Sequence, residues 1–458
     1  MQQTKHPIII IGAGPVGLAA AAHLIKRGEQ PILLESGKTV GATIQTWRHV
    51  RMFSPWKMAL DETAVSLLEP TGWQQPNLKR LPTGSDLLDD YLLPLAETDE
   101  IKRALRYSHK VIAVGRDGTD KVKSEARDKR PFKIIAETPE GRRTLYARAV
   151  IDTSGTWDSP NPAGAGGYAA DGESSATVVY GIPDVYKKER ASYAGKRTLV
   201  IGSGHSAINV LLDLAKLAGE QEQTKILWAI RRSSVSSIYG GEENDQLPAR
   251  GLLGTRLKEL VESNQLELIS GFSLESITMK NGQKSVTGQA NGERIQLSNI
   301  DNIIAATGQR PDFSFLREVR MDIDPSLESS SALAPMIDPN IHSCGTVPPH
   351  GEAELRHPES RFYIAGIKSY GRAPTFLLAT GYEQVRSIAA WLCGNYEAAR
   401  NVNLVLPETG SCCSDQQFEE EHHAVASSFG SSCCGSTSTS EEAVVEVAEA
   451  PAKGGCCG

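Results

Sequence analysis

Four consecutive isoleucines that lead directly into a glycine-rich turn constrain the fold of this chain more than any other feature. Ile8–Ile11 is an apolar, β-branched run without alternation, as in a strand buried on both faces of a parallel sheet. The turn Gly12–Gly17 follows, and then a run rich in Ala and Leu to Lys26 that favours helix. A second apolar run, Pro31–Leu34, ends in Glu35. Strand, glycine turn, helix, strand and acid in this order predict a dinucleotide-binding unit.

Each glycine of this turn has its own task. Gly12 permits the tight turn after the strand, Gly14 lets the backbone approach a diphosphate, and Gly17 lets the helix pack closely. The diphosphate then lies at the helix N-terminus, beside Pro15, where free N–H groups favour negative charge. Glu35 can accept a hydrogen bond from a ribose hydroxyl. A signal peptide or a membrane span is not expected here, because Gly-Ala-Gly-Pro interrupts the apolar run and no small-residue cleavage site follows.

The same pattern returns near the middle of the chain. Arg197–Ile201 predicts a strand, Gly202–Ala207 a second glycine turn, and the residues to about Leu217 a helix, after which Lys225–Ile230 predicts another strand. Two such units in one chain are far more specific than one. The residues that we expect at the second dinucleotide are Gly202, Gly204, Ser206 and Ala207. His205 is interpreted as scaffolding of the turn rather than as a catalyst.

The second unit ends in two arginines where the first ends in an acid. A guanidinium at Arg231 or Arg232 would bind a 2′-phosphate bidentately, whereas a carboxylate there would repel it. The second site is therefore predicted to take NADPH rather than NADH. A pair of solvated surface arginines is the alternative interpretation.

Further strands lie between and after the two units. They are predicted at Lys110–Val114, Phe132–Thr138 and Leu145–Thr153, and the last of them runs into a small turn at Gly155 that can return the chain to the first sheet. Ser85 is predicted to cap a helix that continues to about Ala96.

Two later strands also end in small residues. Ile303–Ala306 leads into Thr307 and Gly308, and Phe362–Ala365 leads into Gly366. An apolar helix is predicted from Pro374 to about Leu392, because proline is favoured at helix starts. Its N-terminus could stabilise charge on a cofactor ring, or the helix could simply pack on the first sheet.

Three loops connect these elements. Ser36–Trp47 carries glycines and ends in an aromatic residue, and Arg51–Trp56 is irregular; both could close over a cofactor ring or pack on the edge of the sheet. Ser233–Gly251 is a polar loop that either shapes a pocket or is disordered, and short strands are predicted from there to Leu297.

Charge and composition narrow the range of functions. The net charge of −7 argues against nucleic acid as a main partner. The last 52 residues carry nine Asp or Glu and one Lys, a net charge of −8, so the rest of the chain is nearly neutral at +1. No other apolar run is long enough to cross a bilayer. With no export signal, a cytoplasmic, reducing setting is expected.

Six of the eight cysteines lie in a C-terminal tail, residues 407–458, that is rich in Ser, Glu and Gly and is predicted to be disordered. They form three adjacent pairs, Cys412-Cys413, Cys433-Cys434 and Cys456-Cys457. Thiolates select soft ions such as As(III), Hg(II) or Cu(I), so these pairs are predicted to bind a soft metal or metalloid. Zinc binding or a redox-damaged tail are the alternatives.

These motifs together resemble the two-dinucleotide flavoproteins, which include flavin-containing monooxygenases and thioredoxin reductases. The residues that carry the resemblance are Gly12, Gly14, Gly17, Glu35, Gly202, Gly204, Ala207, Arg231 and Ala306-Thr307-Gly308. Four segments look like the flavin monooxygenase-type proteins of arsenic-resistance gene clusters: Arg51–Trp56, Gly202–Ala207, Gln246–Gly251 and Lys368–Gly381.

The resemblance implies an α/β fold with two Rossmann-like domains, one for FAD and one for NADPH, in which the NADPH domain is inserted in the FAD domain. The implied segments are 1–160 and 298–406 for FAD, 161–297 for NADPH, and 407–458 for the disordered Cys-rich tail. The implied FAD contacts are Gly12, Gly14, Pro15, Gly17, Glu35, Ser36, Trp47, Gly155 and Gly366. The implied NADPH contacts are Gly202, Gly204, Ser206, Ala207, Arg231 and Arg232, and Thr307 and Gly308 of segment 298–406 are implied cofactor contacts as well.

The expected function is that of an FAD-dependent NADPH oxidoreductase, a monooxygenase that oxidises a soft nucleophile such as a trivalent arsenical in metalloid detoxification. Thioredoxin and mercuric reductases need a redox-active cysteine pair beside the flavin, and residues 1–406 contain none. The alternatives are a reductase that passes electrons to a metalloid or protein partner, and a non-enzymatic metalloid-sequestering flavoprotein. The expected partner is a small molecule rather than nucleic acid or a membrane, and a homodimer is an open option for the assembly.

Overall fold

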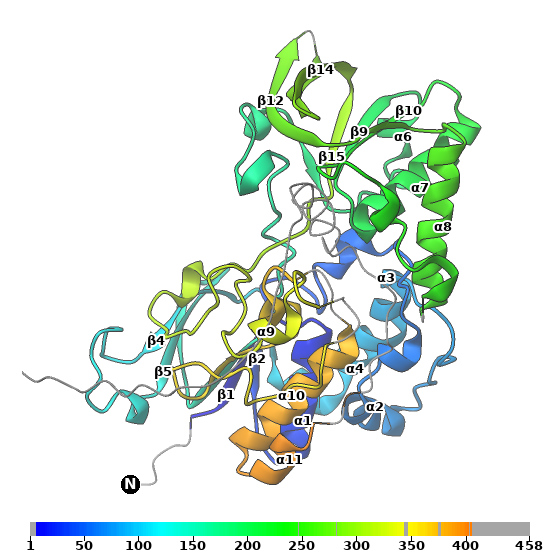
Figure 1. Ribbon diagram of the computed structural model, residues 1–458. Helices are drawn as coiled ribbons and strands as arrows, with labels where there is room; N and C mark the ends of the chain where they lie inside the picture. The colour runs from blue at the N-terminus through cyan, green and yellow to red at the C-terminus, as the bar shows by residue number, and fades with distance from the viewer. Residues whose placement is uncertain are drawn as a thin grey trace, which may run out of the picture. The chain divides into compact units, whose positions relative to one another are not determined.

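The computed structural model describes residues 6–245, 247–280, 282–342, 347–373, 377–402 and 404. All of these residues belong to one compact unit, Met1–Ser414. They form two five-stranded parallel sheets and two three-stranded antiparallel sheets, with helices packed against the parallel sheets (Figure 1). Within these ranges, no helix has the length and apolar character needed to traverse a lipid bilayer.

The first parallel sheet has the strand order β16-β7-β1-β2-β3. The four isoleucines form its central strand, and every residue of that strand is buried. Ile10 lies opposite Leu33 on one side and Ile151 on the other. The strands are β1 (Ile8–Ile11), β2 (Ile32–Leu34), β3 (Leu105–Arg106), β7 (Ala149–Asp152) and β16 (Phe362–Ile364). Because β16 comes from far along the chain, the chain leaves this sheet and later returns to it.

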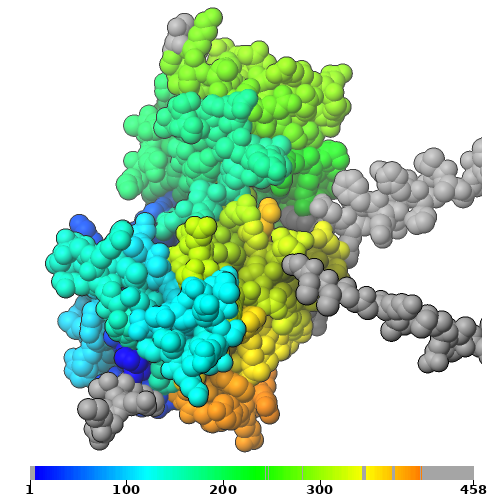
Figure 2. Space-filling model, turned by 90° about the vertical axis from the view of Figure 1, so that its left-hand side faces the viewer, coloured from blue at the N-terminus to red at the C-terminus, as the bar shows by residue number. Residues whose placement is uncertain are grey.

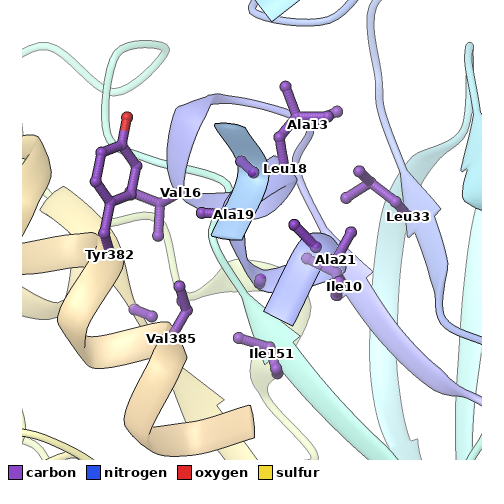
Figure 3. Packing of buried hydrophobic residues seen from close by; sticks show 14 of the residues in the cluster. Ile10, Ala13, Val16, Leu18, Ala19, Ala21, Leu33, Ile151, Tyr382 and Val385 are labelled. Carbon is purple, nitrogen blue, oxygen red and sulfur yellow. The ribbon is translucent and has the colours of Figure 1, made fainter. Parts of the chain in front are cut away.

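Helix α1 (Pro15–Lys26) is the buried helix of the first sheet, and α10 (Leu378–Leu392) lies beside it (Figure 1). The four alanines Ala19–Ala22 are fully buried, and their small side chains let neighbouring elements approach the helix axis. Tyr382 and Val385 of α10 point toward this face of α1 (Figure 3). The hydrophobic run after the glycine turn is therefore a core helix covered on nearly all sides.

The second parallel sheet has the strand order β11-β10-β9-β15-β8. Its strands are β8 (Val179–Tyr180), β9 (Arg197–Ile201), β10 (Lys225–Ala229), β11 (Glu267–Ile269) and β15 (Asn302–Ala305). Helix α7 (His205–Glu220) follows β9 as predicted. Strand β14 (Glu293–Ile300) crosses the predicted boundary between residues 297 and 298, and β15 pairs with β9; the division into domains stays a prediction.

Helix α8 (Pro248–Glu262) occupies residues that the sequence predicted as a polar loop followed by short strands. The helix packs against the preceding segment through two glycines. A β-carbon on Gly251 would lie 1.9 Å from the Glu242 carbonyl oxygen, and one on Gly254 would lie 1.7 Å from the Tyr239 carbonyl oxygen. The prediction was wrong because glycine lowers helix propensity, and this backbone contact, which requires glycine, is not visible in the sequence.

The remaining strands form two antiparallel sheets. One contains β4 (Lys110–Arg116), β5 (Phe132–Thr138) and β6 (Gly141–Ala147), and the other contains β12 (Phe272–Lys280), β13 (Gln283–Ala290) and β14. The predicted single strand Leu145–Thr153 is wrong, because the chain passes from β6 to β7 at Arg148 and so changes sheet.

A buried carboxylate fastens the β4–β5–β6 sheet to the segment that precedes β16. Glu359 accepts hydrogen bonds from Arg116 (2.8 Å) and Arg127 (2.7 Å), and all three side chains are at most 3% exposed. Arg320 adds a further link between the two segments, because its side chain donates to the Lys121 carbonyl oxygen at 2.8 Å. Figure 2 shows the two segments meeting at the surface, where cyan residues of the first lie against yellow residues of the second.

The helices between β2 and β3 are short and follow one another closely. They are α2 (Glu62–Leu68), α3 (Gly84–Leu87), a π-helical turn (Leu88–Leu92), α4 (Leu93–Glu97) and α5 (Asp99–Ala104). The predicted cap at Ser85 is wrong. Thr83 caps α3 in a reciprocal capping box with Asp86, and Ser85 instead donates to Asp89 at 2.9 Å. The remaining helices are α6 (Arg190–Tyr193), α9 (Ala334–Ile337) and α11 (Tyr396–Arg400).

A second buried ion pair joins the ends of β7 and β16. The Lys368 ammonium lies 2.7 Å from the Asp152 carboxylate, and the two side chains are 1% and 0% exposed. Lys368 also donates to Ser154 at 3.2 Å and lies 4.5 Å from the centre of the Phe315 ring. Removing one partner of such a pair leaves an uncompensated buried charge, which costs roughly 3–5 kcal/mol.

Replacing Lys368 by Met is expected to lower the thermal unfolding midpoint by about 5 °C or more, because Asp152 is then buried without its counter-ion. The double variant Asp152→Asn/Lys368→Met should recover part of the loss. Arg142→Met, which removes an exposed pair with Glu137 at 3.8 Å, is the control and should change the midpoint little. Differential scanning calorimetry measures all three, and equal midpoints for Lys368→Met and the control would contradict the expectation.

Helix α10 is tied to the turn after β16 through a buried histidine and a buried glutamine. Gln384 accepts from the Gly366 N–H at 2.8 Å, and its amide nitrogen lies 3.0 Å from His350 Nε2. His350 Nδ1 lies 3.0 Å from the Pro348 carbonyl oxygen, which can only accept, so Nδ1 carries the proton and Nε2 accepts from Gln384. This arrangement needs a neutral His350, and burial lowers its pKa.

Stability is expected to fall as the pH drops from 7.5 to 5.5. A histidine with a lowered folded-state pKa binds fewer protons than in the unfolded chain, where the pKa is about 6.5, so acid favours unfolding. Burial lowers the pKa of His357 to about 4, which adds to the same trend. In His350→Gln, whose amide oxygen can accept from Gln384, the drop in unfolding midpoint between the two pH values should be smaller. A drop as large as that of the wild type would contradict this account.

Candidate functional site

The first glycine turn has the geometry that a diphosphate-binding turn requires. Gly12 has a φ of +97°, and a β-carbon on it would lie 2.8 Å from the Thr153 carbonyl oxygen. A β-carbon on Gly17 would lie 1.9 Å from the Gly12 carbonyl oxygen. A β-carbon on Gly14, by contrast, would meet no atom within 4 Å. Two glycines are thus required by the packing of the protein, and the third faces open space at the start of α1.

The acid after β2 is held against this turn. Glu35 is 6% exposed, and its carboxylate accepts from the Ala13 N–H at 2.8 Å and from the Gly37 N–H at 2.7 Å. The hydroxyl of Ser36 donates to the same carboxylate at 3.4 Å. Oε2 accepts only from Ala13 and retains a lone pair, so the carboxylate can still accept a hydrogen bond from a ribose.

Two further predicted residues surround the N-terminus of α1. The Thr153 hydroxyl donates to the Gly12 carbonyl oxygen at 2.9 Å, which brings the turn that contains Gly155 next to the glycine turn. A β-carbon on Gly366 would lie 3.3 Å from Val16, in the first turn of α1. Gly41 was not predicted as a site residue, yet its N–H donates to the Ala13 carbonyl oxygen at 2.9 Å. Its place in a glycine-bearing loop directly after the acid was the signal available.

Trp47 ends the 3₁₀ turn Ile44–Trp47 and packs against the core around α1. A β-carbon on Gly84 would lie 2.8 Å from the Trp47 ring, and the rings of Trp47 and Trp157 are 6.3 Å apart. The described contacts of Trp47 are therefore with the start of α3 and with the segment after β7. Its predicted contact with a cofactor remains a prediction.

The second glycine turn repeats the first with one change. Gly202 has a φ of +131°, and a β-carbon on it would lie 2.3 Å from the Ala306 carbonyl oxygen. Gly204 starts α7, and a β-carbon on it would meet no atom within 4 Å. Ala207, which replaces the third glycine, is fully buried, and Ser206 lies in the same first turn of the helix. The Trp228 indole donates to the Gly202 carbonyl oxygen at 2.8 Å and holds the turn from the β10 side.

Arg231 and Arg232 follow the carboxyl end of β10, which neighbours β9 in the sheet. Arg231 is exposed, and Arg232 donates to the Ser237 hydroxyl at 2.7 Å. Since α7 begins after the carboxyl end of β9, both arginines lie at the strand edge where α7 starts. This is the place where a guanidinium can meet the 2′-phosphate of a dinucleotide bound at Gly204.

Thr307 and Gly308 lie where the chain passes between the two parallel sheets. The Thr307 hydroxyl donates to the Asn161 carbonyl oxygen at 2.6 Å, and the Asn161 N–H donates to the Gly308 carbonyl oxygen at 2.9 Å. Arg310 N–H donates to the Ser159 carbonyl oxygen at 3.0 Å. The two crossing segments are thus bonded to each other, and the described partners of the Thr307 side chain belong to this crossing.

Both turns fit a dinucleotide diphosphate. Gly14 and Gly204 are each the N-cap of a long helix, make no side-chain cap hydrogen bond, and face open space. The unsatisfied N–H groups of the helix start are then available to an anion. A buried carboxylate accompanies the first turn and two arginines accompany the second. These donor sets suit FAD at α1 and NADPH at α7.

The predicted metal site lies outside the described residues, as do all six of its cysteines: Cys412, Cys413, Cys433, Cys434, Cys456 and Cys457. In the part of the chain that the structure describes, no cluster of three or more His, Cys, Asp or Glu could hold a metal ion. Cys393, the single cysteine within the described ranges, is the C-cap residue of α10.

One protein family and several known proteins are similar to this chain. The family described as pyridine nucleotide-disulphide oxidoreductase matches residues 9–339. The bacilliredoxin reductase Bdr of Bacillus subtilis is 26% identical over 322 residues, which are 69% of this chain and 81% of that protein. The flavin-containing monooxygenase FMO GS-OX-like 2 of Arabidopsis thaliana is 23% identical over 242 residues, 47% of this chain and 49% of that protein. The chain thus spans half or less of the length of the monooxygenases that it matches.

Among solved structures, the bacillithiol disulfide reductase Bdr of Bacillus cereus has a TM-score of 0.64 and 21% identity, and the match covers 85% of this chain and 99% of that chain. This likeness shows a shared fold. The family match covers well over half of the chain and includes both glycine turns. The chain therefore belongs to the pyridine nucleotide-disulphide oxidoreductase family.

Proposed function

We propose that this protein is an NADPH-dependent FAD monooxygenase that adds an oxygen atom to a soft nucleophile such as a trivalent arsenical, in metalloid detoxification. One observation carries the proposal: two open glycine turns, one with an acid and one with arginines, occur in a chain whose first 406 residues hold only Cys344 and Cys393. The family's other main chemistry passes electrons to a cysteine pair, which needs two thiols close together in sequence or space. The similarity to flavin-containing monooxygenases supports the same choice.

The residues proposed to bind FAD surround α1. The backbone N–H groups of Gly14 and of the first turn of α1 would bind the diphosphate, because a β-carbon on Gly14 would meet no atom within 4 Å. Glu35 would hold the ribose, because its hydrogen bond with Ala13 fixes it beside this turn. The full proposed set is Gly12, Gly14, Pro15, Gly17, Glu35, Ser36, Trp47, Gly155 and Gly366. The set proposed for NADPH is Gly202, Gly204, Ser206, Ala207, Arg231 and Arg232, and Thr307 and Gly308 are proposed as further cofactor contacts.

FAD would accept a hydride from NADPH and make O₂ reactive toward the nucleophile. In the overall reaction, NADPH, a proton, O₂ and the arsenical give NADP⁺, water and the arsenical with one added oxygen. The protein's own contribution is to hold the two dinucleotides and to exclude water. The three cysteine pairs of the tail are proposed to capture the metalloid, and a cytoplasmic setting, also proposed, would keep their thiols reduced.

A reductase is the second candidate, because the match to bacilliredoxin reductase covers more of both chains than the match to any monooxygenase reported above. In that case reduced FAD would pass electrons to a metalloid or to a protein partner, and O₂ would not be needed. A third candidate, a non-enzymatic flavoprotein that sequesters metalloids with its tail, predicts no NADPH consumption.

Oxygen dependence separates the candidates. With the FAD-loaded protein and a trivalent arsenical, NADPH oxidation is expected in air and is expected to stop in its absence, with one oxidised arsenical formed per NADPH consumed. Spectrophotometry at 340 nm and chromatography of the arsenical measure the two quantities. Equal turnover without air would establish the reductase, and peroxide release without a change in the arsenical would also contradict the monooxygenase.

Deleting residues 407–458 tests the role of the tail. Reduction of FAD by NADPH should survive the deletion, because both glycine turns belong to the unit Met1–Ser414. Turnover at low arsenical concentration should fall, because the thiols that capture the metalloid are gone. Replacing the six tail cysteines by serine in the full chain is the matched control, and it should reproduce the deletion. An unchanged dependence on arsenical concentration would exclude a role in capture.

Arginines after β10 are expected to select NADPH over NADH. Arg231→Ala should lower kcat/KM for NADPH by about 10- to 100-fold and leave the value for NADH nearly unchanged, because charge-assisted hydrogen bonds are worth about 1.5–3 kcal/mol. The control is Arg197→Ala, which removes a partly exposed pair with Glu267 at the opposite end of the sheet. Anaerobic FAD reduction rates measure the preference. Equal losses with both coenzymes would show that Arg231 does not bind the 2′-phosphate.

A further inference from the structure

His205 is placed at the second dinucleotide site in a way that scaffolding does not explain. It is the first residue of α7 and follows Gly204, the glycine that faces open space. Its backbone carbonyl accepts from Asn209, but its ring makes no hydrogen bond to any residue within the described ranges. A partly buried imidazole at a helix start, with its nitrogens uncommitted, can donate to an anion that binds there.

The ring of His205 also touches the first half of the molecule. Its centre lies 5.1 Å from the centre of the Phe53 ring, with 45° between the planes. Phe53 belongs to the loop Arg51–Trp56, for which the sequence left two interpretations open, closing over a cofactor ring or packing on the edge of the sheet. The loop is anchored on both sides of Phe53, since Met52 N–H donates to the Pro82 carbonyl oxygen at 2.8 Å and Trp56 N–H donates to the Arg80 carbonyl oxygen at 3.0 Å.

The charges around His205 keep its imidazole neutral before a ligand binds. Burial, the largest cause, and the nearby Arg250 guanidinium lower the pKa of His205 to about 4, and the Asp245 carboxylate opposes them. Arg250 and Asp245 form a bidentate pair at 2.7 and 2.8 Å, and both are buried, so neither charge is free to move away. A diphosphate at α7 would add negative charge next to the ring and favour its protonated form.

We propose that His205 binds the diphosphate of NADPH as an imidazolium ion, taking up a proton as the cofactor binds, and that the charged ring strengthens its contact with Phe53. The distance of 5.1 Å lies within the range of a cation–π interaction, which a neutral imidazole does not provide. Occupation of the second site would thereby stiffen the loop that carries Phe53. The inference concerns NADPH binding alone and holds whether the reduced enzyme uses O₂ or another acceptor.

Proton uptake on cofactor binding tests the first half of the proposal. The FAD-loaded full chain is titrated with NADP⁺ by calorimetry in two buffers of different ionisation enthalpy, at pH values from 6 to 7.5. The wild type should take up more protons per NADP⁺ than His205→Asn, and the difference should grow as the pH falls. Relative to the variant, wild-type affinity should tighten by up to about tenfold per pH unit. His342→Asn, a partly exposed histidine far along the chain, should match the wild type.

Identical proton counts for the wild type and His205→Asn would overturn the proposal. Protonation changes of the 2′-phosphate are common to both proteins and cancel in the comparison. If His205→Asn does not fold, the wild type is decisive with NAD⁺, which has the same diphosphate and no 2′-phosphate. Binding of NAD⁺ should then take up protons, and binding without uptake would overturn the proposal.

Hydrogen exchange tests the contact with Phe53. NADP⁺ should slow amide exchange of residues 51–56 in the wild type but not in His205→Asn. Phe53→Leu keeps an apolar side chain but cannot form the cation–π contact, so it should retain proton uptake and lose the NADP⁺-dependent protection. Full protection in Phe53→Leu would remove this half of the proposal, and loss of proton uptake in the same variant would show that Phe53 acts before protonation.

Discussion

Contact between two stretches of bare backbone holds the first nucleotide turn in shape, and the site depends on it. The carbonyl group of Gly12 packs where any side chain on Gly17 would lie, and the Thr153 hydroxyl closes the same contact from β7. Because this packing fixes the start of α1, the open backbone at Gly14 is aimed outward and the buried Glu35 can bond to Ala13. The complete burial of Ala19–Ala22 then follows, since small side chains let a helix pack closely onto a sheet.

The second turn uses the same principle with a looser fit. Its third position is Ala207, which adds a methyl group where the first turn has a glycine. The Trp228 indole of β10 donates a hydrogen bond to the turn and supports it, as backbone contact supports the first turn. The two turns also differ in charge, with a shielded carboxylate at one and exposed arginine at the other. We therefore propose that the shape of both turns suits a diphosphate and that the residue after the second strand decides which dinucleotide each one prefers.

Elements that are encoded by consecutive residues could be predicted from the sequence, whereas features that depend on contacts between distant residues could not. The apolar runs Ile8–Ile11 and Arg197–Ile201 indicate buried strands from their own residues alone, and a glycine turn follows each of them directly. Helix α8 could not be predicted, because its glycines are explained only by the carbonyl groups of Tyr239 and Glu242 that pack against them. The pairing of Lys368 with Asp152, 216 positions apart, has no local signal at all. The same holds for the change of sheet at Arg148, which lies inside the run Leu145–Thr153 that the sequence predicted as one strand.

The double crossing between the two sheets has a mechanical consequence. A single connecting strand can swivel about its own bonds, but residues 159–161 and 307–310 run antiparallel, bridge at Pro160 and Gln309, and share several hydrogen bonds. Rotation about one segment would shear the bonds to the other, so the connector behaves like a flat strap that resists torsion and yields only by bending. Bending of this connector changes the distance between the two nucleotide turns without twisting one against the other about the connector axis.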